Sequence, residues 1–91
     1  MRKNKKEWYV YLVRCRDNSL YCGIAKDVFE REKLHNAGKG AKYTRSRRPV
    51  EIVVCKGPFT KSAASKIEYQ VKQQKAKDKI DFLINYETTK V

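Results

Sequence analysis

The sequence has no apolar run that approaches the roughly 18–20 residues of a membrane-spanning helix. The apolar segment WYVYLV at residues 8–13 follows a basic stretch. It is too short and too aromatic for the core of a secretory leader, and no small-residue cleavage site follows it. These absences predict a cytoplasmic protein without a membrane anchor.

Cysteines are few, and their spacing matches no zinc-binding pattern. The three, Cys15, Cys22 and Cys55, are odd in number, and all lie in strand-like segments. We interpret them as reduced thiols, mostly buried in strands, as is usual for a cytosolic protein. The alternative is a catalytic cysteine, for which His35, the chain's single histidine, is the only candidate base. We favour the buried thiols.

Acidic residues are also scarce: 10 Asp and Glu stand against 22 Lys and Arg, for a formal net charge of +12. Such an excess creates a field that attracts polyanions, of which nucleic acid is the commonest. An anionic membrane surface is the rival partner, but no predicted helix is strongly basic on one face and broadly apolar on the other. The 91 residues suffice for one domain. We expect it at 8–86, between a basic N-terminal tail at 1–7 and a C-terminal tail at 87–91.

Local patterns predict three strands and three helices. The strands are expected at 8–15, 20–24 and 50–55, where aromatic and β-branched residues dominate. The first helix should begin after Asp27, with Glu30 completing a capping box, and should end near Gly38. Two more helices are expected at 62–75, capped by Thr60 or Ser62, and at 78–86. The order ββαβαα predicts an α+β fold, a small antiparallel three-stranded sheet flanked by helices.

The first predicted helix places two chemically versatile side chains on its inner face. At 100° per residue, Arg31 and His35 share an arc with Val28 and Leu34, the residues that should turn toward the sheet. An inward guanidinium carries a desolvation cost unless an anion meets it. The structural interpretation is a partly buried arginine paired with a nearby acid or carbonyl. The functional interpretation is an anionic ligand.

The predicted hairpin adds two phenols to the same region. If the numbers of two residues that face each other across the hairpin add up to 34, Tyr11 lies across from Gly23. Tyr21 then lies across from Val13, on the same face of the sheet. Glycine would leave room for another group beside the Tyr11 phenol. Plain core packing with exposed hydroxyls is the alternative for both tyrosines.

Two further features bear on ligand binding. Glu68 sits at the margin of an apolar stripe in the helix 62–75. It is either a solvated flanking residue or a metal ligand, provided that the stripe packs on the same sheet face. The loop 39–48 contains glycines, no acidic residue, and a set of cations around one aromatic: Lys39, Lys42, Tyr43, Arg45, Arg47 and Arg48. We favour phosphate contact over a merely solvated surface for this loop.

Taken in order, these residues resemble the GIY-YIG nuclease family. Tyr9-Val10-Tyr11 is similar to the first motif and Tyr21-Cys22-Gly23 to the second, with Arg31, His35 and Glu68 at the family's later positions. Tyr9 stands where the first motif has glycine, and Cys22 stands where the second motif has isoleucine. Neither change removes a functional group. The resemblance covers about residues 8–75 and is closest to small stand-alone bacterial members. Asn85 is the candidate for an asparagine that some members carry after the glutamate.

The resemblance implies a metal-dependent endonuclease, with DNA favoured over RNA and a role in repair or recombination. Tyr21, or less favourably Tyr11, would take a proton from the attacking water, and His35 would hydrogen-bond a tyrosine or that water. Arg31 would neutralise the phosphoryl oxygens. Glu68 would hold one Mg²⁺ or Mn²⁺ ion. The basic loop would hold the nucleic-acid backbone.

Two other hypotheses remain open. The first is a basic DNA- or RNA-binding module that keeps the fold without useful catalysis, which predicts salt-sensitive binding and no metal-dependent cleavage. The second is an RNA- or ribosome-associated basic protein. A protein partner and the oligomeric state are not determined by the sequence.

Overall fold

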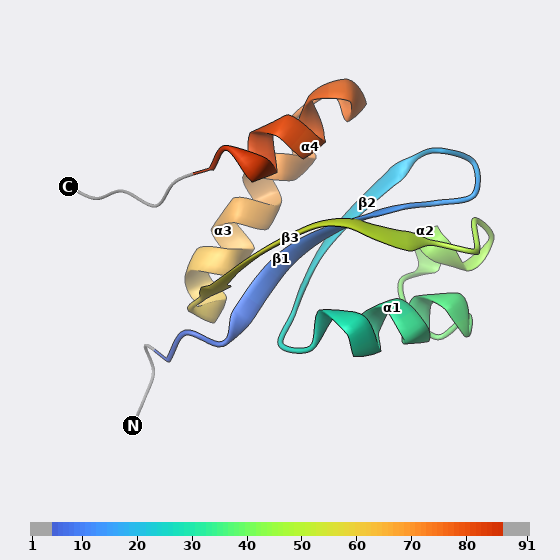
Figure 1. Ribbon diagram of the computed structural model, residues 1–91, viewed down its shortest axis with the longest axis horizontal. Helices are drawn as coiled ribbons and strands as arrows, with labels where there is room; N and C mark the ends of the chain where they lie inside the picture. Colours follow the sequence, from blue (N-terminus) through green and yellow to red (C-terminus); the bar gives the residue numbers. More distant parts are fainter. Residues whose placement is uncertain (1–4, 87–91) are drawn as a thin grey trace.

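The computed structural model describes residues 5–86 and shows an α+β fold (Figure 1). The predicted C-terminal tail at 87–91 and the first four residues of the predicted N-terminal tail lie outside the described residues. The elements follow the predicted order, with one extra helical turn, α2, in the basic loop. They are β1 (Trp8–Arg14), β2 (Leu20–Ala25), α1 (Val28–Asn36), α2 (Lys42–Arg45), β3 (Glu51–Phe59), α3 (Lys61–Lys72) and α4 (Ala76–Ile84).

The sheet is antiparallel throughout, in the order β2-β1-β3. The hairpin has the predicted register, with Tyr11 opposite Gly23 and Val13 opposite Tyr21. Side chains alternate along strands, so both phenols lie on one face of the sheet. Because β1 is central, β2 forms one outer edge of the sheet and β3 the other.

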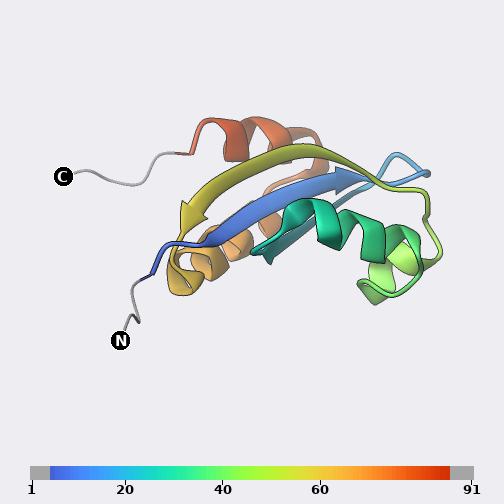
Figure 2. The ribbon, with the colours of Figure 1, turned by 60° about the horizontal axis from the view of Figure 1, so that its bottom comes forward.

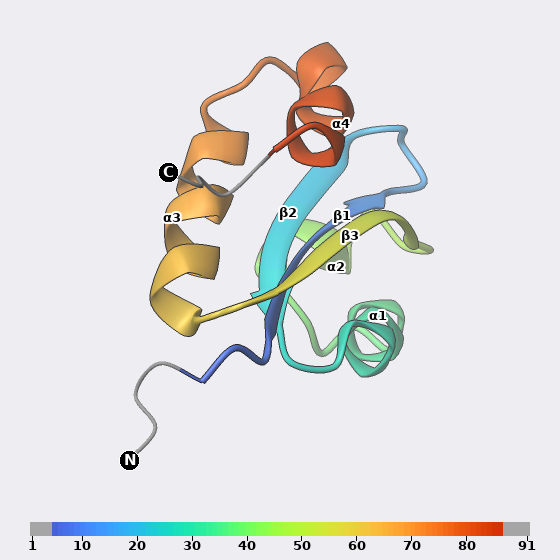
Figure 3. The same cartoon turned by 60° about the vertical axis from the view of Figure 1, so that its left-hand side comes forward.

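The two sheet faces carry different helices. One core cluster joins Val10, Leu12 and Cys22 to buried residues of α3 and α4, which are Ala64, Ile67, Val71 and Leu83. The second cluster joins Tyr11 and Val13 to Val28 of α1. Figures 2 and 3 show α1 and α2 together on one side of the strands and α3 with α4 on the other. The stripe of α3 therefore does not pack on the sheet face of α1, which was the condition set for Glu68 as a metal ligand.

Strand β3 is longer than predicted. Its pattern was expected to end at Cys55, but pairing with β1 continues to Phe59, through Gly57 and Pro58. The register shifts between Trp8 and Val10, so β3 bulges opposite these residues. A bulge on an outer strand is where proline is tolerated, because it removes no ladder hydrogen bond that the sheet needs.

The helix ends follow their capping residues. The Asp27 side chain accepts a hydrogen bond from the Glu30 N–H at 3.0 Å, and Thr60 Oγ1 accepts one from the Ala63 N–H at 3.1 Å. These bonds confirm both predicted N-caps and show that Thr60, rather than Ser62, caps α3. Helix α3 ends at Lys72, short of the predicted 75, and α4 starts earlier than predicted, at Ala76. Across residues 5–86, every helix is too short or too polar to cross a membrane.

Cysteines behave mostly as expected. Cys15 and Cys22 are buried and Cys55 is exposed on β3, and all three are free thiols. Burial raises the pKa of Cys22 to about 12, so its thiolate is scarce at neutral pH. Cys22 also packs in the cluster of α3 and α4, on the sheet face away from His35. This placement argues against a Cys22–His35 catalytic pair.

Candidate active site at the edge of strand β2

One pocket of about 250 Å³ gathers the predicted site residues. Its lining consists of Tyr11, Tyr21, Gly23, Ile24, Arg31, His35, Gly40, Ala41 and Glu68. The pocket lies beside β2, where the sheet ends. Helix α1 supplies Arg31 and His35 from one face, while α3 supplies Glu68 from the other face. The edge of the sheet therefore lets Glu68 reach the phenols, although α3 packs on the opposite face.

Gly23 creates the space around Tyr11, as its position across the hairpin predicted. A Cβ atom at residue 23 would lie 2.5 Å from the Tyr11 hydroxyl oxygen and 2.8 Å from the ring carbon that bears it. Any larger residue would displace the phenol. The hairpin register thus leaves the tyrosine hydroxyl free to turn toward α1.

Tyr11, His35 and Thr44 form a buried chain of hydrogen bonds. The Tyr11 hydroxyl lies 2.9 Å from His35 Nε2, and His35 Nδ1 lies 2.9 Å from Thr44 Oγ1. Thr44 Oγ1 donates in turn to the Ala41 carbonyl at 2.9 Å. In the tautomer that satisfies this chain, Nδ1–H donates to Thr44, and Nε2 accepts from the Tyr11 hydroxyl. The Ala41 N–H also donates to Nδ1 at 3.3 Å, and this bond fits the other tautomer, in which Nε2–H donates to the Tyr11 oxygen.

Burial controls the protonation of this chain. Burial is the main cause that raises the pKa of Tyr11 well above its usual range, while Arg31 acts in the opposite direction. Burial also lowers the pKa of His35, and the positive charge of Arg31 lowers it further. The resting site therefore holds a neutral phenol against a neutral imidazole.

Tyr21 is held by a stack of side chains. Its ring stacks on Tyr43 at 5.9 Å between centroids, and the Arg47 guanidinium carbon lies over the Tyr43 ring, 3.9 Å from its centroid. Arg47 is in turn paired with Asp17 at 3.0 Å. Burial raises the pKa of Tyr21; Lys72 and Arg31 oppose this rise, and Glu68 adds to it. The positive charge of Arg31 lowers the pKa of this phenol, but burial outweighs it.

Arg31 has a free guanidinium. Within residues 5–86, neither a carboxylate nor a carbonyl accepts a hydrogen bond from its side chain. The structural interpretation, an arginine paired with a local acid or carbonyl, is therefore not what the described residues show. A partly buried guanidinium without a partner suits an anionic ligand.

Glu68 is the only carboxylate among the described residues that line this pocket. It is three-quarters buried and pairs with Lys72, one helical turn on, at 3.1 Å. Residues 5–86 contain no cluster of three or more His, Cys, Asp or Glu side chains that could hold a metal ion. A single carboxylate fits Mg²⁺, which keeps several waters and takes its other ligands from substrate phosphates.

The basic loop lies at one side of the pocket, and its six predicted contact residues differ in solvent exposure and in hydrogen bonding. Lys39, Lys42, Tyr43, Arg45 and Arg48 are exposed, whereas Arg47 is half-buried. Arg47 and Arg48 also donate to backbone carbonyls within the loop. Asn85 is not in the pocket: it lines a separate hollow with Phe82 and Tyr86 at the end of α4.

Sequence reasoning missed two residues of the site. Thr44 is fully buried on α2 and hydrogen-bonds His35. Gly40 approaches so closely that a Cβ atom there would overlap the His35 ring. The glycine-rich loop indicated a close backbone approach, but nothing in the sequence indicated that its partner is the histidine.

The chain is similar to a family of known proteins. A family model described as the GIY-YIG catalytic domain matches residues 7–81. A UPF0213 protein from Staphylococcus epidermidis is 56% identical over 73 residues, covering 76% of this chain and 89% of that protein. Another, from Staphylococcus saprophyticus, is 53% identical over 64 residues, covering 70% of this chain and 78% of that protein.

Two solved structures are also similar. The solution NMR structure of the UPF0213 protein BH0048 from Bacillus halodurans has a TM-score of 0.52 at 40% identity, covering 85% of this chain and 82% of that one. The solution NMR structure of the protein EF2693 from E. faecalis has a TM-score of 0.61 at 35% identity, covering 98% of this chain and 99% of that one.

Proposed function

Because this chain belongs to the GIY-YIG catalytic-domain family, as its resemblance predicted, we propose that it is a metal-dependent endonuclease that hydrolyses phosphodiester bonds in DNA. The observation that carries the proposal is the convergence of Tyr11, Tyr21, Arg31, His35 and Glu68 on one pocket. Phosphodiester hydrolysis needs a proton acceptor for water and positive charge for the phosphoryl oxygens. The pocket contains a group for each task.

Arg31 is the proposed binding group for the scissile phosphate. Its guanidinium can donate two parallel hydrogen bonds to phosphate oxygens and has no competing carboxylate among the described residues. The bound anion would also offset the charge that lowers the pKa of His35. Substrate binding would therefore make the imidazole a better base.

The Tyr11–His35 hydrogen bond supports Tyr11 as the proton acceptor, the alternative that the sequence favoured less. The attacking water would give its proton to the Tyr11 oxygen as the phenol's own proton moves along the 2.9 Å bond to Nε2. The water oxygen then forms a bond to phosphorus, the bond to the leaving oxygen breaks, and that oxygen takes a proton from solvent. Tyr21, held against Tyr43, would orient the water.

Glu68 would hold one Mg²⁺ or Mn²⁺ ion through the carboxylate that pairs with Lys72 in this structure. When bound, the ion supplies positive charge for the phosphoryl and leaving oxygens. The loop cations, Lys39, Lys42, Arg45, Arg47 and Arg48, would contact neighbouring phosphates, with Tyr43 beside them. Such contacts position the nucleic acid without reading its sequence.

The test is cleavage of labelled duplex and branched DNA in Mg²⁺ or Mn²⁺. We expect Arg31→Ala, Glu68→Gln and Tyr11→Phe each to slow cleavage by about 100-fold or more, as removal of single charge-stabilising or proton-transfer groups does elsewhere. Tyr21→Phe should cost less than Tyr11→Phe if Tyr11 accepts the proton.

Matched controls are Arg14→Ala, on the far sheet face, and Glu30→Gln, an exposed carboxylate of α1. Both should cleave at the wild-type rate. Cleavage that survives Arg31→Ala, Glu68→Gln and Tyr11→Phe would overturn the proposal. Salt-sensitive binding without any metal-dependent cleavage would instead support the alternative, a basic nucleic-acid-binding module.

A further inference from the structure

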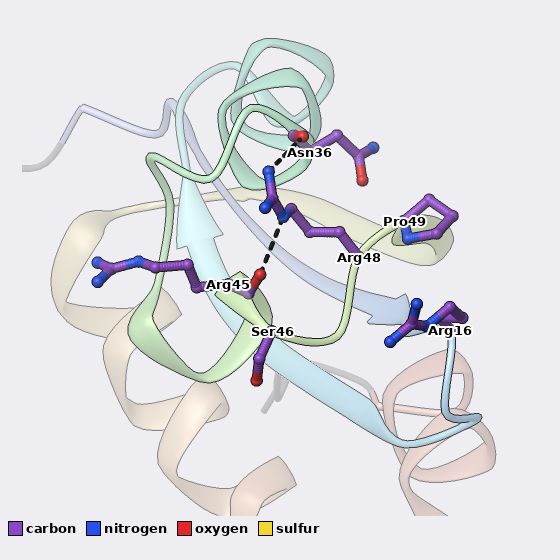
Figure 4. Close-up of a pocket in the computed structure, with 6 residues that line it drawn as sticks. All are labelled: Arg16, Asn36, Arg45, Ser46, Arg48 and Pro49. Carbon is purple, nitrogen blue, oxygen red and sulfur yellow. Dashed lines mark hydrogen bonds between the residues drawn. The ribbon is translucent and has the colours of Figure 1, made fainter.

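A second hollow lies outside the candidate active site and is rich in arginine. Figure 4 shows its lining, which comprises Arg16, Asn36, Arg45, Ser46, Arg48 and Pro49. The hollow is open and measures about 440 Å³, and no carboxylate among the described residues lines it. Its residues come from the β1–β2 turn, the ends of α1 and α2, and the segment between α2 and β3. A concave, acid-free surface with several guanidinium groups favours an anion.

Arg48 is fixed by backbone atoms rather than by an acid. Its Nε donates to the Arg45 carbonyl at 2.9 Å, and its Nη1 donates to the Asn36 carbonyl at 3.3 Å (Figure 4). A guanidinium has five N–H donors, so three remain for a ligand. Gly38, at φ 80°, lies so close that a Cβ atom there would be 2.9 Å from Nη1. The orientation of this cation is therefore set before any ligand binds, which reduces the entropy lost on binding.

Arg16 reaches the same hollow from the hairpin turn. Its backbone N–H donates to the Arg47 carbonyl at 2.9 Å, which ties the turn to the segment before β3. In Figure 4 its side chain lies across the hollow from Arg48, whereas the Arg45 side chain extends away on the other side of α2. Neither Arg16 nor Arg48 forms an ion pair with a carboxylate of residues 5–86.

The hollow is connected to the candidate active site by one short segment. Gly40 and Ala41 line the active-site pocket, and Arg45 and Ser46 line the hollow, so the two border opposite ends of the α2 region. Between them, Arg47 is paired with Asp17, while Lys42 and Arg45 of α2 are exposed. A nucleic-acid backbone that enters one site can therefore follow α2 to the other.

We propose that Arg16 and Arg48 bind a second phosphate of the DNA backbone, distinct from the phosphate that Arg31 would bind. This inference rests on the proposed function and names a further contact of the same substrate. Two guanidinium groups offer the forked donors that match phosphate oxygens. Their contact fixes where the strand leaves α2 and hence which bond lies in the active-site pocket.

The test is the affinity for duplex DNA, measured by fluorescence anisotropy over a range of salt concentrations with EDTA present, so that cleavage cannot occur. Arg16→Gln should weaken binding several-fold and reduce the slope of log K against log salt by about 1, the value of one lost phosphate contact. Arg14→Gln is the matched control, since it removes the same charge from β1. Alternate residues of a strand point to the same face, so Arg14 shares the sheet face of Val10 and Leu12, which pack on α3 and α4. Arg14→Gln should therefore change the slope little.

A second measurement uses inorganic phosphate as the probe and follows the protein by NMR. The Arg48 Nε–H signal and the amides of Arg16 and Ser46 should shift on titration, and the shifts should weaken in Arg16→Gln. Equal slopes for Arg16→Gln and Arg14→Gln, or no phosphate response near Arg48, would overturn the inference. If the wild-type protein does not cleave DNA but Arg16→Gln still weakens DNA binding, only the proposed function is overturned. Absence of DNA binding by the wild type would overturn both.

Discussion

His35 lies between Tyr11 and Thr44 with only 1% of its surface exposed. Each ring nitrogen has a hydrogen-bond partner, so the neutral form is well satisfied where it is buried. The charged form would have to sit near Arg31 and out of water, and both effects lower its pKa. The same residue therefore links the candidate chemistry to the stability of the fold.

This link predicts a pH dependence of stability. Since the pKa of His35 is lowered in the folded state from its ordinary value of 6.5, the unfolded chain binds the proton more tightly. The free energy of unfolding should be at its highest above pH 6.5, where His35 is neutral in both states. It should fall as the pH drops below 6.5, by at most about 1.4 kcal/mol per pH unit for one proton. Urea unfolding at pH 7.5 and 5.5 measures the change.

His35→Gln is the control for this prediction. The chain has no other histidine, and the carboxyls of Glu7 and Asp17 have lowered pKa values and stay ionised in this range. The variant should be less stable overall but should lose the dependence between the two pH values. An equal dependence in the variant would show that another group is responsible.

At this scale the sequence predicted which candidate residues would lie together but not how they are held. The helical period predicted that Arg31 and His35 share one face of α1. The predicted register of the hairpin placed Gly23 opposite Tyr11, as the structure has it. Thr44 could not be predicted, because its role depends on how the loop folds back over α1. The Tyr21–Tyr43–Arg47–Asp17 stack could not be predicted either, since it joins residues from three segments.

Helix α1 carries both Arg31 and His35, and its start depends on Asp27. The Asp27 side chain accepts from the Glu30 N–H at 3.0 Å and places a negative charge at the helix N-terminus. We expect Asp27→Ala to lower the free energy of unfolding by about 1 kcal/mol, the usual cost of losing such a cap. Thermal or urea unfolding measures this directly.

Asp27→Asn is the matched variant because asparagine caps about as well as aspartate. It should retain most of the stability, losing only the contribution of the charge. If alanine and asparagine were equally destabilising, charge rather than the capping hydrogen bond would hold this end of α1. If neither changed stability, the cap would contribute nothing to the fold.

Elements with a clear local signal were predictable, and those that depend on tertiary context were not. Both N-caps and the hairpin register followed from residue type and spacing. The extension of β3 through Gly57 and Pro58 did not, because these residues ordinarily end a strand and only the outer position and bulge permit them. Helix α2 has four residues, too few for a periodic pattern.

Over the whole molecule, charge and shape agree. The net charge of +12 predicted a polyanionic partner, and the loop and hollow around α2 gather exposed arginines and lysines next to the candidate active site. What composition could not predict is that the site spans both faces of the sheet. Glu68 reaches the phenols around the edge of β2, although its helix packs on the face opposite α1.

The central claim is that Glu68 holds a divalent cation in the pocket of Tyr11 and Arg31. The most direct test is paramagnetic broadening of the protein's own NMR signals by Mn²⁺, which no contaminating nuclease can imitate. The account predicts broadening centred on the amides of Gly23, Ile24 and Ala41, its loss in Glu68→Gln, and its retention in Asp78→Asn on α4. Broadening centred elsewhere, or unchanged in Glu68→Gln, would contradict it.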